Sequence, residues 1–580
     1  MKKIMLAVMA FVFMGNSAFA GGILTNTNQS IHFLRNPARG GAIGIDGTYS
    51  NPAGVAFLSE GLHISVDLQN VHQKREVSTA FLPFAYGARN PFQSAAALNG
   101  ITAPKDFKGD AVAPILPSLH AAYNKGKLSL QFNFGVEGGG GKCIFYNGLP
   151  SFESNVAMLP LLSKNMDAFT TAMGLGTLGL PTVDGYNMDT YMRGRQYYFG
   201  LRFGAAYKLT DNLSVYGGIR ALYGTGNYYG YVRNIQAIIG GQSVPASQTF
   251  QAGATEAVRA IGYYTAKAED AAAAGDAAGA AAAQGAAQQA YLKAVMLSAL
   301  GEATQDVMLN CDQEGWGFAP VLGIDYKIGR FNLAAKYEFR VAMRLMNRAT
   351  NSETAANLEM LDRWAEGTTV REDTPALLTI GGQYSPIDNL RIMAGWHLYF
   401  DKDAKKYDNA QKKLGGNTME YLFGAEYDIN DKLEVSAGTQ FTRYKMTQEF
   451  IEDLSFNVNS YSFGFGVGYK VTDKIKLNAA YFQTNYSTFD RTTQNYNDLS
   501  SMAGKIVGGV SKTVANQQAL NQGATAEQAA TIAANTAATN ATMVKTALTT
   551  PGAQGTSALY GKDSFTRSNR VIGLGVEFKF

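Results

Sequence analysis

The sequence has few histidines, little net charge and no long apolar run after its amino terminus, and each scarcity excludes a class of protein. The five histidines are scattered without the spacing of metal ligands, so we expect no metal site and no cofactor. A formal net charge of +4 over 580 residues does not suggest a nucleic-acid partner. The alanine run from Ala271 to Ala290 carries Asp276 and several glutamines, so it is too weakly apolar for a membrane helix.

A catalytic constellation is also missing, and we therefore expect no enzyme. No G-x-S-x-G occurs, and the run Gly138 to Lys142 departs from a phosphate loop because Cys143 replaces Ser or Thr and Val136 replaces the first glycine. Several carboxylates could in principle act as acid/base pairs, but we expect them to join basic side chains in structural networks of a barrel lumen. The groups concerned are Glu338, Glu426, Glu434 and Glu577 with Arg220, Arg340, Arg391 and Lys476.

The first twenty residues are typical of a cleaved export signal. Lys2 and Lys3 precede a short apolar run from Ile4 to Met14, and Ala18-Phe19-Ala20 is a small-x-small cleavage site. Residue 21 is glycine and not cysteine, which argues against a lipoprotein anchor. We expect residues 1–20 to be removed and the mature chain to begin at Gly21, outside the cytoplasm.

One unit recurs from about residue 118: an alternating stretch, a short polar turn and another alternating stretch. Turns of this composition join antiparallel strands, so six of them predict six hairpins. The turns are Asn124–Lys127, Leu209–Asn212, Ile328–Arg330, Pro386–Asn389, Ile429–Lys432 and Val471–Lys474.

Each stretch has one apolar and one polar face. In the last one, Ile572, Leu574, Val576, Phe578 and Phe580 alternate with glycine, Glu577 and Lys579. A soluble sandwich would place the apolar face inward. However, aromatic residues gather near the strand ends, short turns alternate with long connections, and the polar faces hold charges, which together favour a transmembrane barrel.

Adding a strand near residues 61–70 and the last strand gives an all-β fold, a closed antiparallel barrel of about fourteen strands. We expect residues 21–59 to form a hatch in the lumen or a periplasmic tail, and residues 60–580 to form the barrel. The predicted location is the outer membrane of a Gram-negative cell, as a monomer in contact with lipid and lipopolysaccharide. The aromatic carboxyl-terminal strand ending at Phe580 is expected to engage the barrel-assembly machinery.

Two long extracellular loops, about 233–313 and 490–567, are rich in alanine. Ala286 to Leu300 and Ala526 to Leu548 have helix-favouring composition, although mobile low-complexity insertions are the alternative. Cys143 and Cys311 both fall at outer strand ends, and an exported protein permits a disulfide between them.

The stretch Asn51-Pro52-Ala53-Gly54-Val55-Ala56, directly before Gly61 to Ser65, resembles the FadL family of outer-membrane transporters for long-chain fatty acids and other hydrophobic compounds. Gly315 to Phe318 and Thr374 to Leu377 are also similar to this family. The alanine-rich loops are longer than the family's usual external loops, and a second Asn-Pro-Ala triplet at Asn36 to Ala38 makes the alignment of the hatch ambiguous.

The resemblance implies passive uptake of a fatty acid or hydrocarbon through the barrel. The hatch would rearrange, and the ligand would leave sideways at a kink in the third strand. Asn51, Pro52 and Ala53 would gate together with the run Gly138, Gly139, Gly140 and Gly141, which is alternatively the start of a flexible outer loop. The resemblance makes Ile31, Phe33 and Leu34 candidate ligand contacts. A surface adhesin and a general porin for polar solutes remain competing hypotheses.

Overall fold

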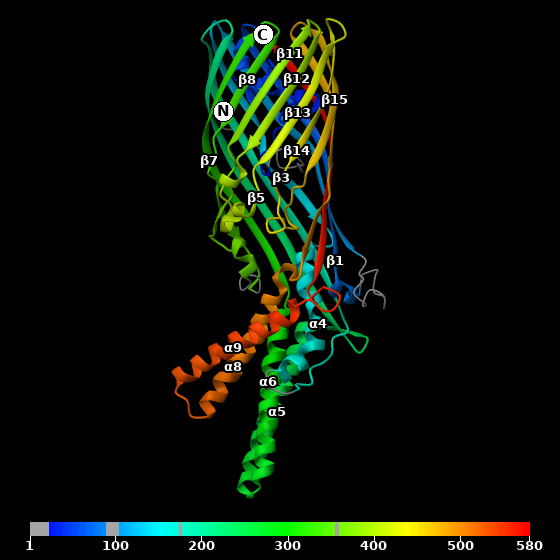
Figure 1. Ribbon diagram of the computed structural model, residues 1–580, viewed down its shortest axis with the longest axis vertical. Coiled ribbons are helices and arrows are strands. Elements are labelled where there is room, and N and C mark those ends of the chain that lie inside the picture. The colour runs from blue at the N-terminus through cyan, green and yellow to red at the C-terminus, as the bar shows by residue number, and fades with distance from the viewer. Residues whose placement is uncertain (1–22, 89–103, 173–176, 354–358) are drawn as a thin grey trace.

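The computed structural model describes residues 23–88, 104–172, 177–353 and 359–580. Within them the chain forms a closed antiparallel barrel whose first strand pairs with both its neighbour in sequence and the last strand (Figure 1). Fourteen of the described strands make up the wall, which confirms the predicted fold class. The predicted export signal lies outside the described residues.

The wall strands follow one another around the barrel in chain order. They are β1 (Gly61–Phe81), β2 (Lys105–Lys125), β3 (Leu128–Phe145), β4 (Gly185–Lys208), β5 (Leu213–Ile239), β7 (Val307–Ile328), β8 (Phe331–Glu338), β11 (Leu377–Ile387), β12 (Leu390–Tyr399), β13 (Thr418–Asp428), β14 (Leu433–Arg443), β15 (Ser460–Thr472), β16 (Ile475–Tyr486) and β18 (Gly561–Lys579).

All six predicted short turns join neighbouring strands, at one end of the barrel. The β4–β5 turn shows how polar residues stabilise such a turn. The Thr210 hydroxyl accepts hydrogen bonds from the amides of Asn212 and Leu213. Gly126 and Gly329 take positive φ in two others, of +58° and +57°. Closure adds the pairing of β1 with β18, from His63 opposite Lys579 to Phe81 opposite Gly561.

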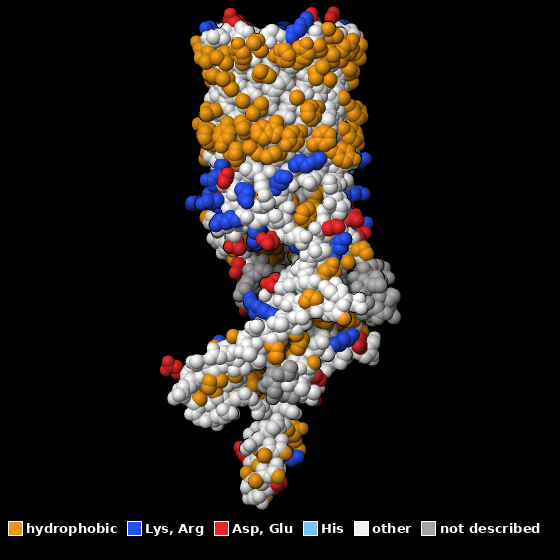
Figure 2. Space-filling model, viewed as in Figure 1, with side chains coloured by type: hydrophobic (Ala, Val, Ile, Leu, Met, Phe, Trp, Pro, Cys, Tyr) orange, Lys and Arg blue, Asp and Glu red, His pale blue; other side chains and the backbone are white. Residues whose placement is uncertain are grey.

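The outer surface carries two bands of hydrophobic side chains near the end with the short turns (Figure 2). On β7, Tyr326 stands beside the turn and Trp316 ten residues away, both exposed. At about 3.3 Å per residue and a tilt of about 40°, this separation covers about 25 Å, the height of the apolar belt of an outer-membrane barrel. The barrel therefore spans a membrane, with the architecture of outer-membrane proteins.

No helix among the described residues is long and apolar enough to cross a bilayer.

Several strands continue well beyond the apolar belt. β1 has 21 residues, whereas about 9–11 suffice to span a membrane. Four short strands extend this outer part of the wall. They are β6 (Gln242–Pro245) on β5, β9 (Arg344–Ala349) on β7, β10 (Thr369–Arg371) on β9 and β17 (Phe489–Thr493) on β18.

A helical head stands on this extended end (Figure 1). It consists of α4 (Pro150–Ala172), the hairpin of α5 (Ala246–Ala273) and α6 (Ala277–Ala303), and the hairpin of α8 (Leu499–Asn521) and α9 (Ala526–Thr549), with η4 (Leu82–Tyr86) and η9 (Tyr496–Asp498) at its base. A buried cluster that includes Phe84, Met158, Leu297 and Val507 joins these helices to the rim. The expected helices are therefore present in both alanine-rich insertions.

Residues 23–60 form an N-terminal segment that lies inside the barrel. It contains α2 (Ile31–Arg35), η2 (Arg39–Gly41), α3 (Gly47–Ser50) and η3 (Gly54–Phe57), and α2 packs against β15, β16 and β18. The Ser30 hydroxyl caps α2 by accepting from the Phe33 amide. The connections at the outer end also contain η6 (Glu359–Trp364), η7 (Asp401–Asp403) and η8 (Tyr407–Lys413), and residues of η6 and η8 line a cavity there.

Candidate functional site

The wall is interrupted between β2 and β3. Their backbones pair from Lys125–Leu128 up to Leu119–Phe134 and again at Asp110–Ile144, but not in between. We call this interval, residues 111–118 of β2 and 135–143 of β3, the β2–β3 gap. On its other side, β3 remains paired with β4 through two register shifts, between Val136 and Gly138 and between Gly138 and Gly141. Such bulges bend a strand and leave its edge unpaired.

The glycine run makes this distortion possible. Gly139 and Gly141 have φ of +94° and +69°, in the left-handed region that favours glycine. A Cβ on Gly138 would lie 2.7 Å from the carbonyl oxygen of Leu24, and one on Gly139 would collide with the carbonyl oxygen of Gln196. The run is thus an irregular part of β3 and not the start of a loop, since β3 continues to Phe145.

The start of the N-terminal segment takes the place of β2 at the gap. The Asn26 amide donates to the Glu137 carbonyl at 2.9 Å, and the Gly139 amide donates to the Leu24 carbonyl at 3.0 Å. The Gln29 side chain donates to the Val136 carbonyl at 2.8 Å, and the Ser118 hydroxyl of β2 donates to the Gln29 carbonyl at 2.6 Å. These contacts satisfy backbone groups that the interrupted ladder would otherwise leave free.

Asn51, Pro52 and Ala53 bind the wall elsewhere. The Asn51 side chain donates to Asp325 of β7 at 2.6 Å, the Pro52 carbonyl accepts from Gln131 of β3 at 2.7 Å, and the Ala53 carbonyl accepts from Ser214 of β5 at 2.6 Å. Gln131 lies on the regularly paired part of β3, so the polar contacts of this triplet are not with the distorted part. The expected partner of the kink is replaced by Leu24 to Gln29, which sequence reasoning missed.

Ion pairs fasten the N-terminal segment to the opposite wall. Arg35 reaches Glu434 at 2.6 Å, Arg39 reaches Glu426 at 2.6 Å, and His32 Nε2 lies 2.7 Å from Glu577. Arg35 Nη2 is also 2.8 Å from His32 Nδ1, so a neutral His32 with its proton on Nε2 satisfies both contacts. We call these three contacts, two ion pairs and the His32–Glu577 hydrogen bond, the latch.

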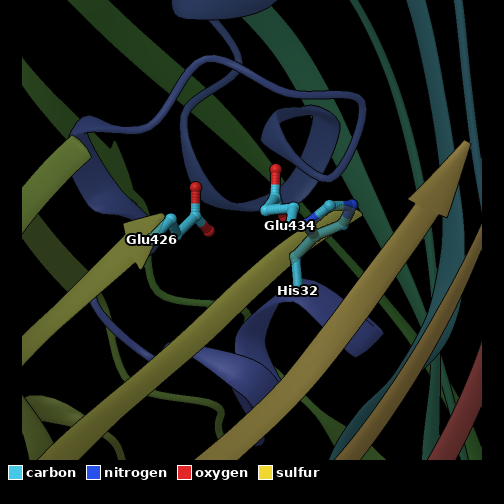
Figure 3. Close-up of side chains that lie close together, drawn as sticks. All are labelled: His32, Glu426 and Glu434. Carbon is cyan, nitrogen blue, oxygen red and sulfur yellow. The ribbon is translucent and has the colours of Figure 1, made fainter. Parts of the chain in front are cut away.

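Figure 3 shows His32, Glu426 and Glu434 together beside the N-terminal segment, close enough for their ligand atoms to share a metal ion. The ligand atoms of these three side chains already bind other groups of the protein. Arg391 contacts both glutamates, and Lys476 reaches Glu434 at 3.2 Å in addition to the latch arginines. Cations on every side favour an ionic network here over a metal site.

A second buried network of ion pairs lies at Glu137, within the β2–β3 gap. Arg202 makes two 2.6 Å hydrogen bonds to Glu137 and one of 2.8 Å to Glu338, which also contacts Arg220 and Lys336. The Arg202 guanidinium lies 4.1 Å from the ring centre of Tyr49 in the N-terminal segment. The predicted lumen networks are confirmed, except that Arg340 pairs with Asp373.

A cavity of about 140 Å³ lies beyond the gap, toward the helical head. Its apolar lining includes Leu24, Phe145 and Leu454, and its basic lining is Arg75, Arg195, Arg363 and Lys406. Arg363 and Lys406 both pair with Glu372. Arg75 is buried, and among the described residues its side chain hydrogen-bonds only to the Gln73 side chain, at 3.0 Å. The Nε atom of Arg195 is also buried and has no hydrogen-bond partner among the described residues. Two guanidinium groups are thus left uncompensated beside apolar surface.

The predicted ligand contacts do not line this cavity. Ile31, Phe33 and Leu34 are buried against the wall, with Phe33 and Phe482 rings 5.8 Å apart. Their role in ligand binding stays a prediction that requires the N-terminal segment to move.

Cys143 and Cys311 are both free and buried. Cys143 of β3 lies opposite Gly194 of β4, Gly194 opposite Tyr228 of β5, and Tyr228 opposite Cys311 of β7. Three strand spacings of about 4.8 Å separate the two thiols by about 14 Å, whereas a disulfide needs Cα atoms within about 7 Å. The disulfide that the sequence permits is therefore not formed, because strand-end position alone does not show the register that separates the two cysteines.

Asp401, in η7 outside the membrane, helps to hold the beginning of the N-terminal segment. Its carboxylate accepts from the Thr418 amide at 3.1 Å and interacts with the Ile23 backbone. Burial raises the pKa of Asp401 to about 6, because desolvation of the carboxylate outweighs these hydrogen bonds.

Comparisons with known proteins support the fold. No family model matches the sequence, and no curated protein matches it. The structure is similar to that of a Pseudomonas aeruginosa FadL homologue, with a TM-score of 0.54 and 11% identity over 97% of this chain and all of that one. The P. putida toluene transporter TodX (TM-score 0.46, 11% identity, 93% of this chain and 94% of that one) and the Ralstonia pickettii toluene transporter TbuX (0.41, 15%, 94% and 98%) are also similar. The chain has the fold of a FadL homologue.

Proposed function

We propose that this protein is an outer-membrane channel for passive uptake of long-chain fatty acids or other hydrophobic compounds. The observation that carries the proposal is the β2–β3 gap, closed by Leu24 to Gln29 and not by β2. The gap is also lined by an apolar cluster of Leu116, Val136 and Tyr197, packed with Phe199. An apolar opening at the β2–β3 gap of a membrane-spanning wall suits a ligand that passes into lipid and not into water.

The cavity supports the first step of such a route. A ligand entering from the head side would place its apolar chain against Leu24 and Phe145, with a gain of about 0.8 kcal/mol for each buried methylene. Arg75 and Arg195 would receive an acidic head group, because a charged hydrogen bond contributes about 1.5–3 kcal/mol. This pair of free guanidinium groups favours a fatty acid over a neutral hydrocarbon.

The second step would displace the start of the N-terminal segment. Leu24 lines the cavity, so a long acyl chain that passes from the cavity to the gap would push Leu24 away from β3. Without ligand, the same movement would strip the Glu137 carbonyl and the Gly139 amide of their partners at an apolar wall, which is unfavourable. The gap would thus stay closed until a ligand fills the cavity, and it would then serve as the lateral exit.

The test compares retention and permeation. Protein purified in detergent should retain oleate, and liposomes that contain the intact protein should not admit glucose. Glucose permeation without oleate retention would favour the general porin, and neither activity would contradict both channel functions.

A surface adhesin is the second candidate, and the helical head supports it. Val258 and Tyr263 on α5 and Ile532 on α9 are exposed apolar residues on hairpins that project from the barrel. Loss of cell attachment with unchanged oleate uptake after deletion of both hairpins would assign this function to the head alone.

A further inference from the structure

On the face that Figure 2 shows, basic side chains gather just beyond the apolar band nearer the helical head. On β18, Arg570 shares a face with the exposed Ile572 and lies two residues nearer the helical head. On β14, Arg443 lies two residues beyond Phe441 on the same face, also toward the head. Lys402 lies two residues beyond Phe400, past the end of β12. Arg344 is at the level of Trp316, because its carbonyl group contacts the neighbouring Gly315. On β1, His72 pairs with Arg570, and Lys74 is the next outward residue.

We call Lys74, Arg344, Lys402, Arg443 and Arg570 the basic collar. All five are exposed, and no carboxylate of the described ranges forms an ion pair with any of them. Three cations that stand farther from the membrane are paired. Lys108 contacts Glu76 and Asp106, Arg348 contacts Glu314, and Lys562 contacts Asp490. The collar cations thus lack the carboxylate partners that these three outer cations have.

This layer is the level of lipid head groups. Lys74, Arg443 and Arg570 point sideways toward the membrane, because they share the outward faces of their strands with the apolar band. A guanidinium binds phosphate through two parallel hydrogen bonds, and several cations in one layer add to the attraction for an anionic lipid surface. A lipid can place its acyl chains on the apolar band and its phosphate on the adjoining cations, so the position favours a lipid.

We propose that the basic collar binds the phosphate groups of phosphorylated lipids in the outer leaflet. The collar fixes the depth of the barrel in the membrane, independently of what passes through the lumen.

The test uses the full-length protein and the triple variant R344Q/R443Q/R570Q. Each is incubated with micelles that contain diphosphorylated lipid A or its dephosphorylated form, and retained lipid is counted by native mass spectrometry. We expect the native protein to retain the phosphorylated form and the triple variant to retain about a hundredfold less. The matched control K108Q/R348Q/K562Q, which removes paired cations, should retain as much as the native protein.

Equal retention by the triple variant, or equal retention of the dephosphorylated lipid, would overturn the proposal. Release of lipid A by a soluble polyphosphate at equal phosphate concentration would assign the collar to soluble polyanions instead. If the triple variant does not give a heat-resistant barrel, R570Q alone is measured, and a loss of about fivefold is expected from one collar cation.

Discussion

The backbone amide of Asn26 donates a hydrogen bond of 2.9 Å to the carbonyl oxygen of Glu137, across a place where the wall strands β2 and β3 do not pair. A segment from the beginning of the chain thereby completes the sheet. The distorted strand needs glycine, the segment needs its latch, and the cavity behind the segment holds free cations. Each of these dependencies is open to measurement.

The substitution Gly139→Ala should destabilise the barrel, because a Cβ at φ +94° is strained and meets the Gln196 carbonyl. We expect a loss of about 1–3 kcal/mol in the free energy of unfolding, measured with urea in micelles. Gly217→Ala on β5 is the matched control, since its Cβ would have no neighbour within 4 Å. Equal stability of both variants would contradict the distortion of β3.

The substitution Glu434→Gln should loosen the N-terminal segment, because it leaves the fully buried Arg35 without its carboxylate. Removing one partner of a buried ion pair costs about 3–5 kcal/mol. Amides of residues 31–41 should therefore exchange hydrogen faster in the variant. Asp388→Asn, which breaks the exposed pair with Arg330, should leave this exchange unchanged. Unchanged exchange in E434Q would exclude the latch.

Stability should depend on the ionisation of Asp401. Its folded pKa of about 6 exceeds the unfolded value of 3.8, so the folded state binds the proton more tightly. Stability should fall as the pH rises from 4 through 6, by about 3 kcal/mol. The variant Asp401→Asn should lose this part of the pH dependence, as judged from urea unfolding at pH 4 and pH 7. Identical pH profiles of the two proteins would show that Asp401 titrates normally.

The substitution Arg75→Gln should weaken oleate binding by about tenfold or more, because a charged hydrogen bond is lost. Binding of oleyl alcohol, which has no charge, should change little, and titration calorimetry can measure both. Arg330→Gln, on a short turn away from the cavity, is the control. An equal loss of affinity for the acid and the alcohol would mean that Arg75 supports the cavity structurally and does not bind the carboxylate head group.

The sequence predicted the membrane barrel well because its determinants are local. Alternation such as Ile572 to Phe580 identifies a strand and its two faces, and turns such as Leu209–Asn212 fix the pairing of the strands that they join. Composition also predicted helices in both alanine-rich insertions. The helix α4 was missed, and it contains Pro160, a residue that ordinarily argues against a helix interior.

The site was harder to predict because it depends on contacts between distant segments. The glycine run marked the place of the distortion, but Leu24 to Gln29 carries no periodic pattern that would identify it as the partner of β3. Arg75 and Arg195 resemble other charged residues of their strands, and only the fold shows that they face a cavity without carboxylate partners. The cysteine pairing failed for the related reason that register is a three-dimensional property.

A reversible tether tests the central claim most directly. In a C143S/C311S background, Gln29→Cys and Ser118→Cys would join the N-terminal segment to β2, where the Ser118 hydroxyl now meets the Gln29 carbonyl. Oleate uptake into liposomes is then measured with the tether oxidised and again after reduction. We expect uptake to stop when the tether forms and to return when it is reduced. Undiminished uptake through a fully tethered protein would contradict the exit at the β2–β3 gap.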